Sequence, residues 1–373
     1  MNSPHDSFAP SSQKPVRLAA CITAHGFGHS TRSIAILQAA QRKYPHLELL
    51  LFTTAPSHLF EESLKNFTII PIENDVGLIQ RDALTADLPA TIKALDRLFP
   101  LSPQHIHSVV EKLAGCSAVL SDISPLGIVS ASAANIPSVL VENFTWDWIY
   151  EPFAASFPEI VPHIETLRSI YTKATHHIQT EPICVPTSTA QRCGPIFRFS
   201  SASPAQIKAN IKEEFCVGDR HLILVSMGGF NFSLSLWTEI FERKDYFFLL
   251  AGQPEQKRIA GNVMSLCHDS GYYHPDLIAA ADLVICKSGY STIAECFQAG
   301  TRVIGIDRPF FAESAILANF VTTTLKGKVI NDTDFIEGRW LNLIDNSVKE
   351  PRPRPAENNC ADQVADILLN YCR

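Results

Sequence analysis

The fold is decided by residues 275–320, which read PDLIAAADLVICKSGYSTIAECFQAGTRVIGIDRPFFAESAILANF. Their apolar periodicity predicts alternating helices and strands, in order Pro275–Ala281, Leu283–Cys286, Ser291–Ala299 and Val303–Ile306. A glycine turn, Lys287–Thr292, joins the first strand to the second helix. Alternation of this kind produces a parallel sheet with helices on both faces.

The same alternation continues outward from this stretch. Two more strands precede it, His221–Ser226 and Tyr246–Ala251, and an amphipathic helix over Ala356–Tyr371 follows it. The first half has its own strands and helices, predicted at Val16–Thr23, Thr31–Lys43, Leu47–Phe52, Phe67–Pro71, Leu88–Leu113 (broken near Pro100 and Pro103), Ala118–Ser121 and Ser138–Val141. The sequence therefore predicts an α/β protein of two facing, Rossmann-like, doubly wound lobes with a cleft between them.

Length and composition agree with two domains. The chain has 373 residues, of which 46% are hydrophobic and 18% charged, and this excludes disorder for most of it. The expected division is a loose tail over 1–15, a first lobe over 16–190, a hinge over 191–198 that contains Gly194-Pro195, a second lobe over 199–355 and a closing helix over 356–373.

Charge and cysteine spacing exclude several classes of function. The net charge is −7, whereas proteins that bind a nucleic-acid backbone usually carry a basic excess, so no nucleic-acid partner is expected. The ten cysteines contain no CxxC pair and no zinc spacing, so no metal site is expected. The first residues do not resemble a signal peptide, and no apolar run is long enough to cross a bilayer. These features predict a cytoplasmic protein.

The first strand leads directly into a glycine loop, His25-Gly26-Phe27-Gly28-His29. A dinucleotide-binding loop would need a third glycine near Thr31 and an acid at the end of the second strand, and both are missing. A histidine at this edge of a parallel sheet can act as a general base, and Asp122, at the end of another strand, can orient it. Structural roles remain open, because the histidine and Asp122 are also plausible helix caps.

The glycine turn of the second lobe suits a diphosphate, because backbone N–H groups at a helix start bind anions. Glu295 lies one turn after Ser291 and has two acceptor oxygens for two ribose hydroxyls, although a surface glutamate is the ordinary alternative. A second glycine turn, Ser226–Gly229, follows an earlier strand. Lys287 and Arg308 either neutralise phosphate or are solvated.

Three segments resemble glycosyltransferases of the GT-B fold: His25–His29 (HGFGH), Lys287–Thr292 (KSGYST), and the later Arg308–Glu313 (RPFFAE). Within that fold they are similar to the MurG and UDP-glycosyltransferase branch. Together with Asn143–Asp147 (NFTWD), they are similar in particular to the glycosyltransferase-like N-terminal region of plant arabinokinases. The likeness covers most of the chain from about Val16 to Phe320.

The resemblance implies a nucleotide-sugar donor on the second lobe, an acceptor on the first, and no bound cofactor or catalytic metal. It places the base on His29, its partner on Asp122 and the ribose-binding acid on Glu295. Where the family often has an acid followed by Gln, this chain has Glu313-Ser314, so the donor sugar stays open. The expected donor-binding residues are Ser226, Gly228, Gly229, Lys287, Ser288, Gly289, Tyr290, Ser291, Thr292, Glu295, Arg308 and Glu313.

These observations predict the transfer of a sugar from a nucleotide-linked donor to an acceptor hydroxyl, with inversion. The expected nucleotide is UDP. Two alternatives are a nucleotide-sugar epimerase or hydrolase of the same fold and a sugar-nucleotide sensor without catalysis. Trp146 and Trp148 belong to an aromatic segment that either lines the acceptor pocket or packs between the lobes. Peripheral membrane contact has little support, because few basic residues lie near the apolar segment Phe153–Val161. Asp332-Thr333-Asp334 is interpreted as a surface loop rather than a metal motif.

Overall fold

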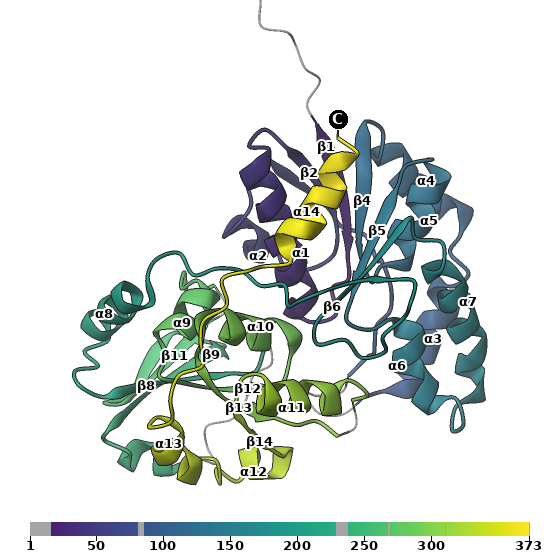
Figure 1. Ribbon diagram of the computed structural model, residues 1–373. Coiled ribbons are helices and arrows are strands. Elements are labelled where there is room, and N and C mark those ends of the chain that lie inside the picture. The colour runs from purple at the N-terminus through teal and green to yellow at the C-terminus, as the bar shows by residue number, and fades with distance from the viewer. Residues whose placement is uncertain (1–15, 81–85, 229–237, 268, 310, 373) are drawn as a thin grey trace, which may run out of the picture.

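Within residues 16–80, 86–228, 238–267, 269–309 and 311–372, which the computed structural model describes, the strands form two sheets of seven (Figure 1). Each sheet is covered by helices, and the two lobes face each other. The predicted α/β architecture of two Rossmann-like lobes is confirmed. The predicted tail over residues 1–15 lies outside the described residues.

The first sheet is parallel throughout. Its strands, in spatial order, are β3 (Phe67–Ile70), β2 (Glu48–Phe52), β1 (Arg17–Ile22), β4 (Cys116–Asp122), β5 (Ser138–Glu142), β6 (His176–Thr180) and β7 (Gln191–Cys193). Its helices are α1 (Phe27–Lys43), α2 (His58–Glu61), α3 (Leu88–Leu98), α4 (Pro103–Lys112), α5 (Pro125–Ala133), α6 (Trp146–Tyr150) and α7 (Val161–Tyr171). The segment expected to be a hinge thus begins with the edge strand β7.

Both faces of this sheet are buried, because successive side chains of a strand point to opposite faces. In β1, Leu18 and Ala20 pack under α1, whereas Ala19 and Cys21 pack under α4 and α5. This two-sided burial explains why β1 reads as a continuous apolar run rather than an alternating one.

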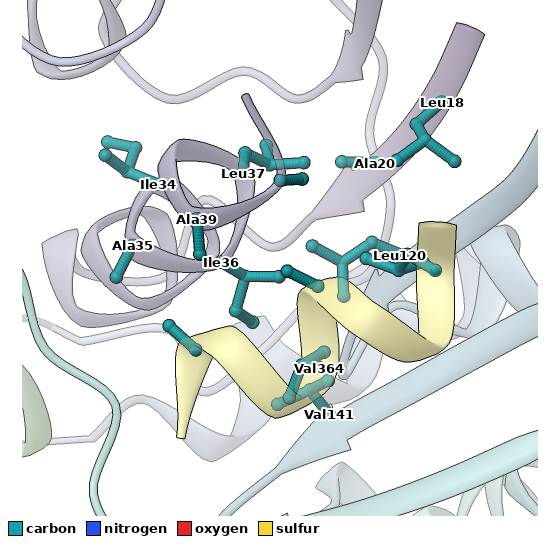
Figure 2. Close-up of a cluster of buried hydrophobic side chains, with 14 of the residues drawn as sticks. Leu18, Ala20, Ile34, Ala35, Ile36, Leu37, Ala39, Leu120, Val141 and Val364 are labelled. Atoms are coloured by element: carbon teal, nitrogen blue, oxygen red, sulfur yellow. The ribbon is translucent and has the colours of Figure 1, made fainter. Parts of the chain in front are cut away.

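The last helix, α14 (Ala361–Asn370), packs on the first lobe although the chain reaches it from the second (Figure 1). Val364 lies in one apolar cluster with Ile36 of α1 and Val141 of β5 (Figure 2). Lys43 and Arg42, in the last turn of α1, form ion pairs with acidic residues of α14. The first lobe is therefore completed by the end of the chain.

The second sheet has the order β10 (Lys257–Ala260), β11 (Val263–Cys267), β9 (Tyr246–Gln253), β8 (His221–Ser226), β12 (Leu283–Lys287), β13 (Arg302–Ile306) and β14 (Lys328–Ile330). One face is covered by α8 (Pro204–Glu214), α9 (His274–Ala280), α10 (Tyr290–Ala299) and α11 (Ser314–Thr323). The other is covered by α12 (Asp332–Ile336) and α13 (Leu341–Ser347). Only the edge strand β10 departs from the parallel arrangement predicted from the sequence, in the part of the chain that the structure describes.

Two local expectations are wrong. Helix α1 begins at Phe27 instead of Thr31, because Gly26 takes a positive φ of 78° and turns the chain directly into the helix. Asp332-Thr333-Asp334 is the start of α12 instead of a loop, because the Asn331 side chain accepts a hydrogen bond from the Asp334 nitrogen and caps that helix.

The lobes meet where two helices begin. A Cβ on Gly28, in the first turn of α1, would lie 3.9 Å from the backbone nitrogen of Ser291 in the first turn of α10. Both helices follow the carboxyl ends of parallel strands, which is where open α/β sheets bind ligands. Among the described helices, none is long and apolar enough to span a lipid bilayer.

Candidate active site between the lobes

A cavity of about 400 Å³ lies between the two helix starts. It brings together most residues that the sequence predicts for the site. The first lobe contributes His25, Gly26, Phe27, Gly28, His29 and Trp146, and the second contributes Gly228, Lys287, Gly289, Tyr290, Ser291, Thr292, Arg308 and Glu313. Segments more than 250 residues apart in sequence therefore face one another across a single opening.

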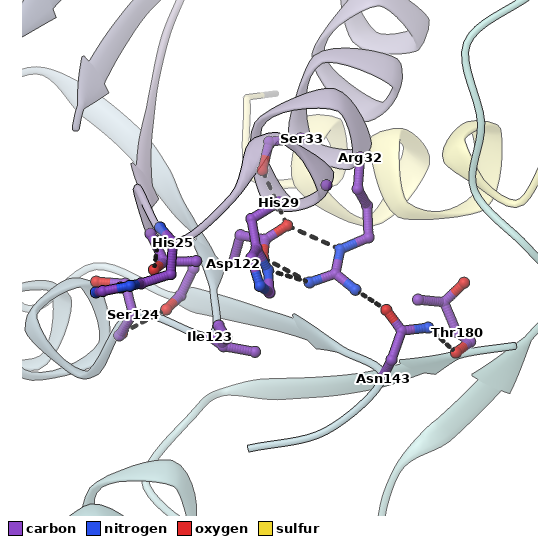
Figure 3. A network of polar contacts seen from close by, with 12 residues as sticks. His25, His29, Arg32, Ser33, Asp122, Ile123, Ser124, Asn143 and Thr180 are labelled. Atoms are coloured by element: carbon purple, nitrogen blue, oxygen red, sulfur yellow. Dashed lines mark hydrogen bonds and ion pairs between the residues drawn. The ribbon is translucent and has the colours of Figure 1, made fainter. Parts of the chain in front are cut away.

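His29 and Asp122 are paired in the wall of this cavity, with 2.8 Å between Nδ1 and Oδ1 (Figure 3). His29 stands in the first turn of α1, and Asp122 ends β4, the neighbouring strand to β1. Asp122 is fully buried and His29 is 12% exposed. Since a carboxylate only accepts, Nδ1 donates to it, and Nε2 carries the lone pair.

Arg32 completes the charge balance of this pair, a role that was not predicted from the sequence. Its Nε and Nη2 donate to the two oxygens of Asp122 at 2.8 and 2.5 Å, and Ser33 donates a third bond at 3.0 Å. Nη1 of Arg32 donates to Asn143 at the end of β5 (Figure 3). Burial alone would raise the pKa of Asp122, but the Arg32 charge and the bonds from His29 and Arg32 lower it to about 2.

His29 is neutral near pH 7 for a related reason. Burial lowers its pKa below the ordinary value of 6.5, and the bond to Asp122 offsets only part of that effect. The Arg32 guanidinium, whose Nη2 lies 3.2 Å from Nδ1, lowers the pKa further. A neutral imidazole held at Nδ1 is able to take a proton at Nε2.

Another part of the first-lobe wall contains the rings of half-buried His25 and buried Trp146, which lie near the buried carboxyl of Asp75. Trp146 packs edge-on against His25 with 5.7 Å between ring centroids, and its Nε1 donates to Asp75 at 2.8 Å. Thr23 donates a second bond to Asp75 at 2.8 Å. Burial raises the pKa of Asp75 to about 7 despite these two bonds, and burial lowers the pKa of His25 to about 4. Asp75 lies in the loop after β3 and has no sequence signature of its own.

The opposite wall carries two cations beside the start of α10. Lys287 ends β12 and Arg308 follows β13, so both reach the carboxyl edge of the second sheet. Burial and, to a lesser extent, the neighbouring Arg308 together lower the pKa of Lys287 to about 7. Arg308 packs 4.0 Å from the Phe311 ring centroid and bonds Glu313 at 3.2 Å. An anion bound here would restore the charge on Lys287.

A smaller cavity of about 90 Å³ adjoins this wall and is lined by Ser226, Arg198, His274 and Thr292. Beneath it, Glu295 is 1% exposed and uses both oxygens, one toward Arg198 Nε and one toward His274 Nδ1, each at 2.9 Å. His274 Nε2 lies 3.1 Å from the Ser226 hydroxyl. Arg198 and His274 are the partners that sequence reasoning missed. The cue for His274 is its place at the start of α9, beside the glycine turn.

Two further predicted residues, Ser288 and Trp148, lie apart from the main cavity. Ser288 is buried, and its hydroxyl lies where a Cβ on Gly305 would point, 2.7 Å away. Trp148 lines a different cavity in the first lobe, and Gly229 lies outside the described residues. Across the described part of the chain, no group of three or more His, Cys, Asp or Glu side chains is arranged to hold a metal ion.

Comparison with known proteins supports the relation to GT-B glycosyltransferases. The family model of the glycosyltransferase family 28 C-terminal domain matches residues 244–368. L-arabinokinase of Arabidopsis thaliana is 26% identical over 358 residues, which are 90% of this chain and 32% of that protein. The chain thus spans about a third of the length of the curated relative it matches.

Solved structures agree on the fold. The Arabidopsis thaliana UGT89C1 complexed with quercetin superposes with a TM-score of 0.63 at 14% identity, over 96% of this chain and 100% of that one. MurG of Acinetobacter baumannii superposes with a TM-score of 0.53 at 15% identity, over 95% and 100%. The chain therefore has the two-lobed GT-B fold of these glycosyltransferases, and its residues 244–368 match the family model of the glycosyltransferase family 28 C-terminal domain.

Proposed function

We propose that the chain transfers a sugar from a nucleotide-linked donor to an acceptor hydroxyl with inversion at the anomeric carbon. The observation that supports this most is the neutral His29, held by Asp122 at 2.8 Å, directly across one cavity from Lys287, Arg308 and the start of α10. A base on one wall and an anion-binding wall opposite are what an in-line displacement requires.

In this mechanism Nε2 of His29 takes the proton of the acceptor hydroxyl as that oxygen bonds to the anomeric carbon. The bond from the same carbon to the diphosphate oxygen breaks, and the diphosphate leaves with the electron pair. Asp122 stabilises the imidazolium that forms, and Arg32 keeps Asp122 ionised throughout. Backbone N–H groups of the first turn of α10, together with Lys287 and Arg308, bind the leaving diphosphate.

The nucleoside is assigned to the smaller cavity beside Ser226 and His274, and we propose a UDP-linked donor. Ribose hydroxyls would then replace Arg198 or His274 as partners of Glu295, whose oxygens both accept in this structure. Glu313, which already accepts from Arg308, is assigned to the donor sugar. The acceptor occupies the first-lobe side, between His25, Trp146 and Phe144.

The test is His29→Ala, with turnover and donor binding measured separately. Loss of turnover by about 10²-fold or more with donor affinity retained supports the base role, since general bases contribute about 10²–10⁴-fold. Arg42→Ala, on the exposed end of the same helix, is the matched control and leaves both quantities unchanged. Turnover that survives in His29→Ala contradicts the mechanism.

A sensor without catalysis is the second candidate, and Arg32 is the observation that favours it. Because Arg32 donates twice to Asp122 and lies 3.2 Å from His29 Nδ1, it lowers the basicity of the imidazole. A sensor binds the nucleotide sugar and gives no product with any acceptor or with water. Product analysis therefore separates transfer, hydrolysis or epimerisation, and binding alone.

A further inference from the structure

The first lobe contains a second cavity, of about 620 Å³, which the proposed transfer reaction does not use. Helices α6 and α7 and the ends of β5 and β6 surround it, and its volume is within the usual range for ligand cavities, about 300–1,000 Å³. Phe144 lines both this cavity and the interlobe cavity, so the two share one wall.

Glu142, the last residue of β5, lines this cavity, and one of its two carboxylate oxygens has no hydrogen-bond partner among the described residues. Its side chain is 2% exposed. Oε1 accepts from His177 Nε2 and from Gln179 Nε2, each at 2.7 Å. Oε2 is buried and has no hydrogen-bond partner among the described residues. A buried carboxylate oxygen is costly when it is left unpaired, so this atom indicates a missing donor.

Asp147, on α6, repeats the arrangement in the same cavity. It is 8% exposed, and Oδ2 lies 3.4 Å from Arg168 Nε. Its Oδ1 is buried without a hydrogen-bond partner in the part of the chain that the structure describes. Two carboxylates in the lining of one cavity therefore each carry a buried oxygen without a hydrogen-bond partner among the described residues.

The rest of the lining defines the chemistry of the ligand. Hydroxyl groups come from five threonines: Thr145, Thr172, Thr175, Thr187 and Thr189. Half-buried Trp148 adds an indole ring. The ligand must donate to the carboxylates, exchange hydrogen bonds with hydroxyls in both directions, and offer an apolar face to the indole. A sugar ring meets all three conditions through its hydroxyl groups and its C–H face, whereas a protonated amine only donates.

We propose that this cavity binds a neutral saccharide, with hydroxyl donors on Glu142 Oε2 and Asp147 Oδ1 and the sugar ring against Trp148. Binding at this site is separate from glycosyl transfer, because its lining contains neither His29 nor the residues around Lys287.

The experiment measures binding of the methyl glycosides of common aldohexoses and aldopentoses, and of their disaccharides, to the full chain by saturation-transfer NMR and calorimetry. Glu142→Gln is the sharpest variant: its amide oxygen still accepts from His177 and Gln179, while its NH₂ replaces the free acceptor. We expect at least one sugar to bind, and its affinity to fall about tenfold or more in Glu142→Gln, the effect of one charge-assisted hydrogen bond. Trp148→Ala, on a half-buried side chain, is expected to weaken binding similarly and decides the case if Glu142→Gln does not fold.

Arg42→Met, at an exposed ion pair outside both cavities, is the control and is expected to leave sugar affinity unchanged. Because the experiment measures only sugar binding, its result does not depend on whether the chain catalyses glycosyl transfer. The proposal is overturned if no sugar of the panel binds, if binding is unchanged in both cavity variants, or if spermidine binds there in place of the sugars.

Discussion

Arg32 is the residue that sets the charge state of the candidate base. It lies one helical turn after His29 on the same face of α1, and its guanidinium bridges Asp122 and Asn143. The Arg32 side chain is 7% exposed and the Asp122 side chain is fully buried, so each charge depends on the other for stabilisation. The fixed fork of the guanidinium explains why lysine would be a poor replacement.

Arg32→Met is expected to destabilise the protein strongly. Removing one partner of a buried ion pair leaves an uncompensated charge, which costs about 3–5 kcal/mol in the free energy of unfolding. Urea denaturation measures the change. The matched control is Arg42→Met in the exposed pair with Asp362, which should cost less than about 1 kcal/mol. Equal effects of the two variants would show that the buried pair is unimportant.

Asp122 is expected to make the free energy of unfolding depend on pH in the acid range. Its pKa is about 2 in the folded chain against an ordinary 3.8, so the ionised form is favoured by folding. This contribution, about 2 kcal/mol, is present above pH 4 and is lost as the pH falls toward 2. Denaturation at several pH values should show that loss in the wild type and a smaller one in Asp122→Asn. Identical acid profiles would contradict the assignment.

Lys287 is expected to make donor affinity depend on pH. Its pKa of about 7 means that about half the free protein carries the charge at pH 7, and a diphosphate binds the charged form better. Affinity should therefore fall as pH rises from 7 to 9, by up to about tenfold per unit, with proton uptake on binding. Calorimetry in buffers of different ionisation enthalpy measures both. In Lys287→Met the dependence should flatten, whereas in Lys349→Met, at an exposed position, it should persist.

At the level of single residues, the sequence was sufficient to predict the location of side chains at or just after the end of a strand. His29, Asp122, Lys287 and the turn to Thr292 could be placed because carboxyl ends of parallel strands share an edge. Asp75 and Arg198 could not be placed, because they stand in irregular segments whose path depends on tertiary packing. The position of Arg32 beside His29 could have been predicted, because residues three apart lie on the same face of a helix.

At the level of elements, the C-terminal helix α14 packs against α1 of the first lobe. Leu368 is completely buried in the cluster beneath α1, although it follows the whole second lobe in sequence. The amphipathic pattern predicted a helix there, but periodicity carries no information about which lobe receives its apolar face. Strand β10 was missed for a different reason, because Lys257 and Arg258 are exposed and break the apolar pattern at the sheet edge.

Leu368→Ala is expected to lower the free energy of unfolding of the first lobe by about 2–5 kcal/mol. This is the range for replacing a large side chain by a small one in a packed core. Thermal denaturation followed by tryptophan fluorescence measures it. The matched control, Leu369→Ala, removes a partly buried side chain on the same helix and should cost clearly less. A negligible effect of Leu368→Ala would mean that α14 does not complete the lobe.

At the level of the whole molecule, the arrangement of two lobes divides the chemistry. The first lobe holds the proposed base His29 with Asp122, and the second holds Lys287, Arg308 and the start of α10. Neither lobe encloses the cavity alone. This arrangement reconciles an acidic chain with the proposed anion-binding wall. The net charge of −7 is a sum over the whole sequence, while the wall uses half-buried Lys287, buried Arg308 and a helix start.

Whether the interlobe cavity binds a nucleotide sugar is tested most directly by the melting temperature of the full chain with UDP, GDP, dTDP and their sugars. A ligand that binds only the folded state raises the melting temperature in proportion to the logarithm of its concentration above Kd. One nucleotide, expected to be UDP, should raise it, and the shift should shrink in Lys287→Met. No shift with any nucleotide or nucleotide sugar at millimolar concentration would contradict a donor site between the lobes.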